Sequence, residues 1–152
     1  MKLFKIKKSK IDKNGLYANR DIKKGTRILE YKGKIISVKK SETDPKFDNG
    51  KAIYLFNINK RYDLDGDFKF NLARLINHSC EPNCEVLGSG LKIWIYAMRN
   101  IKKGEELSYD YGFSYDEDYK NYPCKCGTEK CIGYIVREGS RWRINKKKKK
   151  RK

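Results

Sequence analysis

The sequence of 152 residues contains no apolar run long enough to span a bilayer. Its first residues, Met1–Ile11, are basic but lack the continuous apolar segment and the small-residue cleavage site of a secretory signal peptide. There is also no internal repeat with a period of 20–50 residues, which argues against solenoid and propeller architectures. We therefore expect one intracellular globular domain with short appendages.

Histidine is scarce, because His78 is the only one in the chain. A nucleophilic pair of Cys80 and His78 is conceivable on chemical grounds. However, Cys80 lies only two residues from His78, and no second histidine exists to act as its partner. A lone histidine in a polar loop is more often structural than catalytic, so the sequence disfavours this chemistry.

Negative charge is also in short supply. The chain has 37 Lys and Arg against 19 Asp and Glu, a net charge of +18. The last seven residues, Lys146–Lys152, are all basic, but the rest of the chain is basic as well. Such charge favours nucleic acid or another polyanion as a partner, although a solvated surface would look the same. The like-charge tail is predicted to be disordered, and in a eukaryotic cell it would act as a nuclear localisation signal.

Short alternating segments with glycine-bearing turns about every ten residues predict a mainly β fold. Ser41–Gly50 is predicted as a loop, and Asp63–Asp67 as an acidic turn. Strands are predicted over four segments: Arg27–Tyr31, Lys34–Val38, Ala52–Ile58 and Leu91–Met98.

Five cysteines without an export signal argue against a disulfide scaffold. Cys124, Cys126 and Cys131 form a C-x-C-x4-C cluster, which has the spacing of a metal site. Zinc takes four ligands in a tetrahedron, so one more ligand is required. From the residues alone, His78, Cys80 or Cys84 could supply it.

Several segments resemble one known family. Arg74–Cys84, with the sequence R-L-I-N-H-S-C-E-P-N-C, resembles the core signature of SET-domain lysine methyltransferases, and Gly104–Gly112 resembles the second signature. Cys124–Tyr134 resembles the post-SET zinc segment, while Asn14–Ala18 and Glu30–Gly33 match the N-terminal motifs. The motifs follow one another in the family's order from about residue 4 to 136.

The resemblance implies a SET fold: mainly β, with small β-sheets around a pseudoknot-like crossing and a C-terminal zinc knuckle. In this crossing Leu107–Tyr111 would pass beside the Asn77–Cys80 loop. The implied domain boundaries are a SET domain over 1–113, a linker over 114–123, a zinc segment over 124–136 and a disordered basic tail over 137–152.

The resemblance also implies roles for individual residues. S-adenosylmethionine would be the methyl donor, Tyr111 the catalytic tyrosine, and Tyr109 the residue that limits the number of methyl groups. One zinc ion would be bound by Cys80, Cys124, Cys126 and Cys131, and Cys84 would be a buried cysteine that does not bind the metal. The cofactor would be contacted by Asn14, Gly15, Leu16, Tyr54, Arg74, Asn77, His78 and Tyr111.

The sequence departs from the family pattern at two positions. Lys13 occupies the place of the first glycine in a Gly-x-Gly motif, so we expect its backbone to adopt a conformation that glycine would tolerate. Phe70 stands where family members often have glycine, just before Asn71.

The chemistry agrees with this interpretation. Methyl transfer requires a neutral lysine amine, whereas free lysine has a pKa of about 10.4. A narrow aromatic channel lowers that pKa because burial disfavours the charged form, and Tyr54, Tyr109, Tyr111 and Phe113 could form one. The tyrosine at 109 predicts mainly monomethylation.

The sequence leaves the partner open. The substrate could be a histone or another basic chromatin-type protein, with Asp116–Asp118 as an acidic patch that receives it. Two alternatives are a methyltransferase that acts on a non-histone protein and a zinc-stapled, basic nucleic-acid-binding module without catalysis. The second alternative would not need Asn77, His78, Tyr109 and Tyr111 together.

Overall fold

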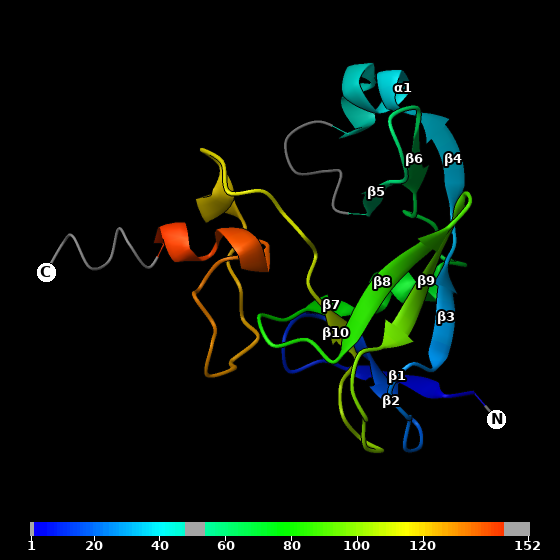
Figure 1. Ribbon diagram of the computed structural model, residues 1–152, viewed down its shortest axis with the longest axis vertical. Coiled ribbons are helices and arrows are strands. Elements are labelled where there is room, and N and C mark those ends of the chain that lie inside the picture. Colours follow the sequence, from blue (N-terminus) through cyan, green and yellow to red (C-terminus); the bar gives the residue numbers. More distant parts are fainter. Residues whose placement is uncertain (1, 48–53, 145–152) are drawn as a thin grey trace, which may run out of the picture.

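The computed structural model describes residues 2–47 and 54–144, and it consists of four small β-sheets with few helices (Figure 1). The mainly β fold expected from the sequence is therefore confirmed. The basic segment Lys146–Lys152 lies outside the described residues. Within the described part of the chain, no helix is both long and apolar enough to cross a membrane.

The N-terminal sheet is an antiparallel hairpin of β1 (Phe4–Lys8) and β2 (Asn14–Ala18). The β1 strand is largely exposed, whereas Gly15–Ala18 are all buried, because other segments pack against β2. The carbonyl oxygen of Leu16 accepts a hydrogen bond of 2.7 Å from Leu107 N, which ties the hairpin to the segment that carries the second signature.

The central sheet has the order β3-β9-β8 and is antiparallel throughout. Its strands are β3 (Arg27–Tyr31), β8 (Cys84–Ser89) and β9 (Lys92–Ala97). In β9 the side chains of Ile93, Ile95 and Ala97 are buried, while the alternate residues are more exposed. This period of two is the pattern from which the strand was predicted, and one face of the sheet thus covers the main core.

The third sheet, of order β4-β6-β5, comprises β4 (Lys34–Ser37), β6 (Tyr62–Asp65) and β5 (Leu55–Asn57). The prediction of an acidic turn over Asp63–Asp67 was wrong for its first half, because Asp63 and Asp65 belong to β6. Both carboxylates are buried but bonded: Asp63 accepts from Ser41 Oγ at 2.5 Å, and Asp65 pairs with Lys46 Nζ at 2.7 Å. These partners allow acidic residues to occupy a strand.

Two short helices replace most of the predicted loop over Ser41–Gly50. The α1 helix spans Val38–Thr43, and a single 3-10 turn, η1, spans Pro45–Phe47. Ser37 Oγ caps α1 by accepting a hydrogen bond from Lys40 N. This helix N-cap was not recognised in the sequence because Ser37 lies within the predicted strand Lys34–Val38. Residues 48–53, which include parts of the predicted loop and of the predicted strand Ala52–Ile58, lie outside the described residues.

The fourth sheet is a parallel pair of only two residues each, β7 (Asn77–His78) and β10 (Ser108–Tyr109). It lies between the sheets and the C-terminal segment (Figure 1). A 3-10 turn, η2 (Leu72–Leu75), leads into β7 and packs against β3. The predicted crossing of Leu107–Tyr111 beside the Asn77–Cys80 loop is therefore present.

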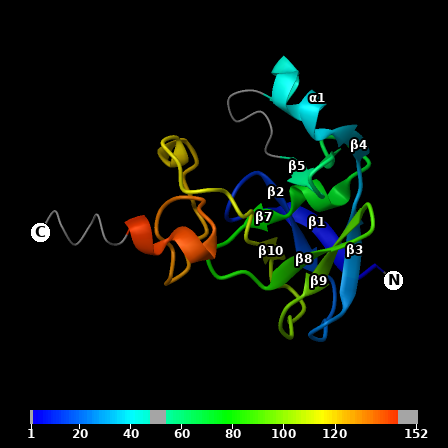
Figure 2. The ribbon, with the colours of Figure 1, turned by 45° about the horizontal axis from the view of Figure 1, so that its top comes forward.

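The chain beyond Phe113 forms a lobe beside the sheets (Figure 2) with a core of its own. It contains two 3-10 turns, η3 (Tyr119–Asn121) and η4 (Glu138–Ser140). The buried members of this second core are Cys80, Tyr119, Ile132, Val136 and Ile144.

The predicted tail is ordered in its first part. Ser140 and Ile144 are buried, and Arg141 donates a hydrogen bond of 2.9 Å to the carbonyl oxygen of Cys80. Disorder over 137–152 was expected from the like-charge run at its end. That run lies outside the described residues, whereas Arg141 and Ile144 before it find partners in the rest of the chain.

Asn83 holds the crossing together, so we expect Asn83→Ala to destabilise the fold. Its side chain is buried, donates to Glu106 O at 2.8 Å and accepts from Ser108 N at 2.9 Å. Removal would leave both backbone groups without these bonds, at about 1–3 kcal/mol for each. Asn100→Ala, which removes an exposed acceptor of Lys24 N, is the control. Urea unfolding would measure the stability of both variants. Equal unfolding midpoints would show that the hydrogen bonds of Asn83 do not stabilise the crossing.

Candidate active site and metal centre

The crossing brings residues of the two signature segments into contact. Tyr111 N donates a hydrogen bond of 3.0 Å to His78 Nδ1, and the Tyr111 hydroxyl donates one of 2.6 Å to Ile76 O. Ser79 N donates to Tyr109 O at 3.3 Å. Both tyrosines predicted to be catalytic are therefore anchored to the loop that contains Asn77 and His78.

His78 is a neutral structural histidine in this arrangement. Burial, opposed by the Asp110 carboxylate and assisted by Arg141, lowers the pKa of His78 to about 4. Its contact of 3.8 Å with Asp110 is therefore not a salt bridge near neutral pH. Since Nδ1 accepts from Tyr111 N, the ring proton belongs on Nε2, which lies 3.9 Å from Cys80 Sγ. The histidine thus links the Tyr111 backbone to one of the cysteines.

A row of aromatic rings leads past the crossing. Ring centroids are 4.5 Å apart for Tyr31 and Phe56, 6.1 Å for Phe56 and Tyr109, 4.9 Å for Tyr109 and Tyr111, and 5.7 Å for Tyr111 and Phe113. The rings come from β3, β5 and the segment from β10 onward. Sequence reasoning identified Tyr109, Tyr111 and Phe113 but missed Tyr31 and Phe56, which lie far away in the sequence.

The hydroxyls of this row stay protonated. Burial, with contributions from neighbouring tyrosines, raises the pKa of Tyr109 and of Tyr111 well above the usual value of a phenol. Tyr54 is among the neighbours that raise both. These tyrosines can therefore donate or accept hydrogen bonds at neutral pH, but they are poor general bases.

Hydrogen-bond acceptors crowd around Asn77. Its Nδ2 lies 3.0 Å from Ser9 Oγ, Asp12 O and Glu106 Oε1, and 3.5 Å from Asn14 O. An amide nitrogen has only two hydrogens, so these acceptors exceed what Asn77 can satisfy. The place is suited to a ligand that brings donors or positive charge.

The turn before β2 has the backbone expected of a glycine motif. Lys13 has a φ of 45°, and it is the one non-glycine residue with positive φ among the described residues. The expected glycine-like conformation of Lys13 is thus confirmed. A Cβ at Gly15 would displace the Glu106 carboxylate from its hydrogen bonds with Ser9 and Asn77. Phe70, the other departure, is 61% exposed and stacks on Phe68, so it disturbs no part of the crossing.

The remaining residues predicted to contact the cofactor are Leu16, Arg74 and Tyr54, and their hydrogen bonds go to other parts of the fold. Leu16 is fully buried in the main core, and its carbonyl oxygen already accepts a hydrogen bond from Leu107 N. Arg74 Nε donates to Phe68 O at 2.9 Å, and Tyr54 O accepts from the Tyr31 hydroxyl at 3.1 Å. These contacts orient η2 and the chain before β5, respectively.

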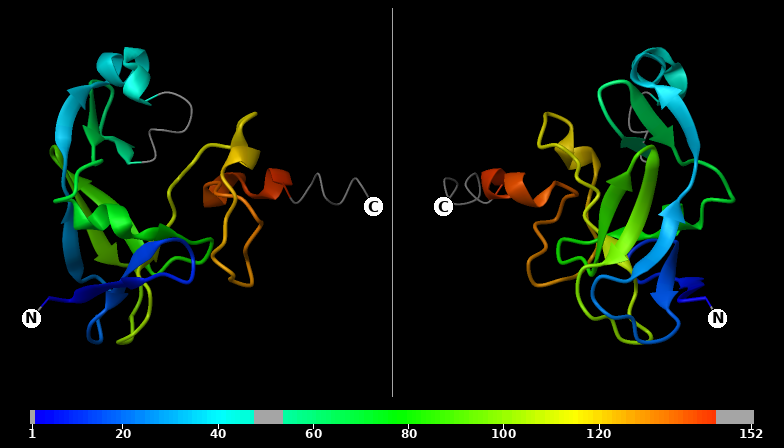
Figure 3. Two further views of the ribbon diagram at one scale, coloured as in Figure 1. Left: turned by 180° about the vertical axis from the view of Figure 1, so that it is seen from behind. Right: turned by 45° about the vertical axis from the view of Figure 1, so that its right-hand side comes forward.

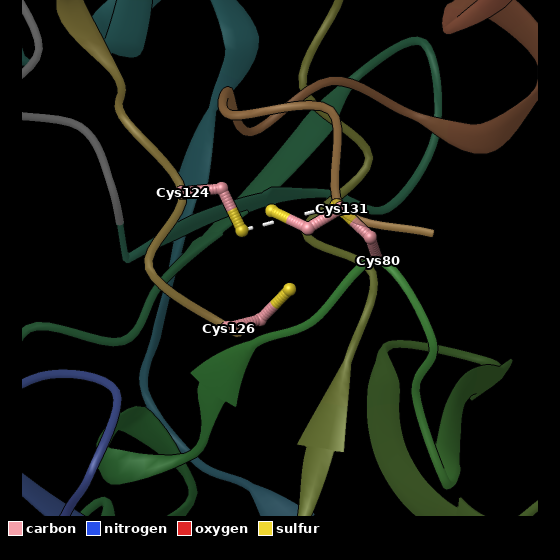
Figure 4. Close-up of side chains that lie close together, drawn as sticks. All are labelled: Cys80, Cys124, Cys126 and Cys131. Atoms are coloured by element: carbon pink, nitrogen blue, oxygen red, sulfur yellow. Dashed lines mark hydrogen bonds between the residues drawn. The ribbon is translucent and has the colours of Figure 1, made fainter. Parts of the chain in front are cut away.

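Four cysteines converge at the base of the C-terminal lobe, as predicted. The Sγ atoms of Cys80, Cys124, Cys126 and Cys131 all lie within 4.8 Å of one another and point toward a common centre (Figure 4). Cys80 Sγ and Cys124 Sγ are 3.8 Å apart. Zn–S bonds of about 2.3 Å in a tetrahedron place sulfur atoms about 3.8 Å apart, so the spacing fits a tetrahedral metal ion.

The surroundings of the sulfur atoms also fit a metal centre. Gly133 N donates to Cys131 Sγ at 3.4 Å, and Thr128 Oγ1 lies 3.2 Å from Cys126 Sγ. Burial raises the pKa of Cys80 to about 11. For Cys126, burial is outweighed by hydrogen bonds from Thr128, and its pKa falls to about 6. Thiolates this close together repel one another, and a dication would remove that repulsion.

The structure distinguishes among the three candidates for the fourth ligand. Cys80 belongs to the cluster, whereas Cys84 is buried in the main core and bonds to Asn83 Oδ1 at 3.4 Å. His78 turns Nδ1 toward Tyr111 N and does not belong to the cluster. A group of four cysteines that can hold one metal ion is thus formed by the predicted residues.

Two residues that sequence reasoning missed connect this centre to the crossing. Arg141 donates to Asp110 Oδ2 at 3.0 Å and to Cys80 O at 2.9 Å (Figure 3 shows the lobe from two further sides). Asp110 Oδ1 in turn accepts from Gly112 N, just after Tyr111. Asp110 lies within the second signature and could have been singled out, but nothing in the sequence marks Arg141.

Comparison with known proteins identifies related sequences. The family model of the SET domain matches residues 13–112. The histone-lysine N-methyltransferase trr of Drosophila melanogaster is 42% identical over 132 residues, which is 83% of this chain and 5% of that protein. Human histone-lysine N-methyltransferase 2D is 40% identical over 132 residues, again 83% of this chain and 2% of that protein.

A fission-yeast relative is similar to the same extent. The histone-lysine N-methyltransferase, H3 lysine-4 specific, of Schizosaccharomyces pombe is 42% identical over 135 residues, 84% of this chain and 14% of that protein. The chain therefore corresponds to a small part of the length of each of these three relatives.

We expect one metal ion per chain and a difference between two cysteine variants. Cys80→Ser should lose the metal or bind it loosely, because it removes one of four ligands. Cys84→Ser is the matched control: it alters a buried cysteine outside the cluster, so it should keep the metal even if stability falls. Elemental analysis of the purified variants measures both. A metal content near zero in folded wild-type protein would refute the ligand set.

Proposed function

This chain belongs to the SET-domain family, and on that premise we propose that it transfers methyl groups from S-adenosylmethionine to the side-chain amine of a histone lysine. The observation that carries the proposal is the crossing, where Tyr109 and Tyr111 lie against the loop of Asn77 and His78. The names of the relatives support a histone lysine as the target.

The acceptor-rich place around Asn77 suits the cofactor. S-adenosylmethionine supplies a methyl group activated by a positively charged sulfur, and it also carries an α-ammonium group. The carbonyl oxygens of Asp12 and Asn14 and the Glu106 carboxylate offer acceptors and negative charge beside Asn77. The backbone of Asn14, Gly15 and Leu16, together with Tyr54, Arg74, Asn77, His78 and Tyr111, would form the binding site.

The aromatic row suits a lysine side chain. Rings around the amine disfavour its ammonium form, so more of the reactive neutral amine is present. The phenolic proton of Tyr111 is committed to Ile76 O, which leaves the oxygen lone pairs of this hydroxyl to face the reacting groups. A hydroxyl oxygen held in this way can orient the amine and accept weak C–H···O contacts from the methyl group. Most of the rate would come from this alignment.

The exposed segment Asp116–Asp118 suits a basic substrate. All three residues are exposed and follow Phe113, whose ring packs against Tyr111. With a net charge of +18, the enzyme would otherwise repel a histone tail. We propose that this acidic patch receives the basic residues next to the target lysine.

We also propose that zinc is the ion held by the four cysteines, since an all-thiolate tetrahedral set favours it. A chromatin-associated, nuclear location follows from the proposed substrate. The experiment that tests the function is methyl transfer from labelled cofactor to histones, nucleosomes and a cell lysate, with mass spectrometry of the labelled lysine. Label on non-histone proteins alone would refute the substrate, and no label anywhere would refute the activity.

Tyr111→Phe should abolish most methyl transfer. A single positioned group of this kind typically contributes on the order of 10²–10⁴-fold to the rate. Tyr96→Phe is the control, because it also removes one hydroxyl that is hydrogen bonded, to Arg27, but on the central sheet. Steady-state rates and calorimetric cofactor binding should show a lower turnover with cofactor affinity largely kept. Near-normal turnover of Tyr111→Phe would mean that the active site lies elsewhere.

The native enzyme should produce mainly monomethyl-lysine, and Tyr109→Phe should produce di- or trimethyl-lysine. A second transfer requires the first methyl group to occupy space beside the Tyr109 hydroxyl, and a methyl group cannot hydrogen-bond to it. A buried polar group left unpaired costs about 1–3 kcal/mol, and about 1.4 kcal/mol changes a rate tenfold. Mass spectrometry after long incubation distinguishes the products. Abundant trimethyl-lysine from the unmutated enzyme would show that Tyr109 does not limit methylation.

A further inference from the structure

A basic six-residue motif occurs twice in the chain. Residues 20–25 read R-D-I-K-K-G, and residues 99–104 read R-N-I-K-K-G. The two copies, which we call the basic double turn, lie 79 positions apart in the sequence but side by side in the structure. They project from the end of the molecule opposite α1 (Figures 1 and 3).

The two turns hold each other through reciprocal hydrogen bonds. Ile22 N donates to Ile101 O at 2.7 Å, and Ile101 N donates to Ile22 O at 2.8 Å. Outside this pair, Lys24 N donates to Asn100 Oδ1 and Lys103 N donates to Asp21 Oδ1, both at 2.9 Å. This reciprocity is expected of two turns related by an approximate two-fold axis.

The glycines end both turns in the same way. Gly25 has a φ of 85° and Gly104 a φ of 93°, values that glycine adopts without strain. The two isoleucines are buried beneath the turns. The backbone that presents the basic side chains is therefore fixed before any partner binds, which reduces the ordering cost of binding.

The turns display six exposed cationic side chains: Arg20, Lys23, Lys24, Arg99, Lys102 and Lys103. Within the described residues, Arg99 is the one member of this set with an ion pair, to Glu105 at 2.9 Å. The carboxylates of Asp21 and Glu105 also accept backbone hydrogen bonds from the turns themselves. Like charges held this close repel one another unless a polyanion lies against them.

A hollow of about 620 Å³ lies beside the double turn. Three cations from both turns and one carboxylate line it, together with Leu3, Ile22 and Thr26; the charged members are Arg20, Lys23, Lys103 and Asp21, whose Oδ1 accepts from Lys103 N. The surface is therefore concave as well as basic, which suits a polyanionic chain lying along it.

We propose that the basic double turn is a docking surface for the phosphate backbone of double-stranded nucleic acid. The turns contain no aromatic residue on which unpaired bases could stack, and their apolar residues are buried, so they offer a lipid bilayer no group to insert. Duplex phosphates are also related by local two-fold axes, and the reciprocal hydrogen bonds relate the backbones of the two turns in the same way. The surface is separate from the methyl-transfer site and does not depend on the proposed activity.

The test compares two full-length variants of equal net charge. The first replaces Lys23, Lys24, Lys102 and Lys103 by Gln. The second replaces four exposed lysines elsewhere, Lys39, Lys40, Lys60 and Lys69, by Gln. Binding to a labelled duplex of about 20 base pairs is measured by fluorescence anisotropy between about 50 and 200 mM salt. Metal content and thermal unfolding verify that both variants are folded.

We expect the first variant to bind the duplex at least about tenfold more weakly than the second at low salt. The slope of log affinity against log salt should fall by about 0.9 for each phosphate that the variant no longer neutralises, up to about 3.6 for four phosphates. Equal losses of affinity in both variants would show that only total charge matters and would overturn the proposal. Weaker binding to anionic vesicles with unchanged duplex binding would assign the surface to a membrane and would also overturn it.

Discussion

The parallel pairing of Ser108–Tyr109 with Asn77–His78 is the contact on which the candidate site depends. A pair of two residues has too few hydrogen bonds to persist alone. Fully buried Ile76 and Leu107 precede its two strands, and the side chain of Asn83 bonds to the backbone of Glu106 and Ser108. Because the chain passes this point twice in the same direction, Ser108, Tyr109 and Tyr111 of the second signature take their positions from the first.

The C-terminal lobe is coupled to this crossing and is more than an appendage. Among the described residues its core has five buried members, one of which is the metal-site residue Cys80. So small a core contributes little folding free energy, and metal binding would supply much of what the lobe needs. The Arg141 guanidinium, Asp110 and the His78 ring connect the lobe to the backbone around Tyr111. Order in the lobe and position of the tyrosine are therefore linked.

Local pattern was enough to predict several elements. The β3 strand begins and ends as predicted, and β9 lies within Leu91–Met98. Prediction failed where a side chain finds a distant partner: Asp63 and Asp65 enter a strand because Ser41 and Lys46 bond them. The helix α1 was missed because its cap, Ser37, stands within an apparent strand pattern.

The sequence by itself determined the family, the metal-ligating residue types and the tyrosines of the site, because these depend on residue identity and short spacing. Cysteine spacing alone left three candidates for the fourth ligand, and the tertiary structure places Cys80, the residue that the family resemblance implied, with the three clustered cysteines. It also assigned Asn83 and Arg141 to contacts that join segments tens of residues apart. Such partners are selected by packing, since the direction in which a side chain leaves a loop depends on how the rest of the chain covers it.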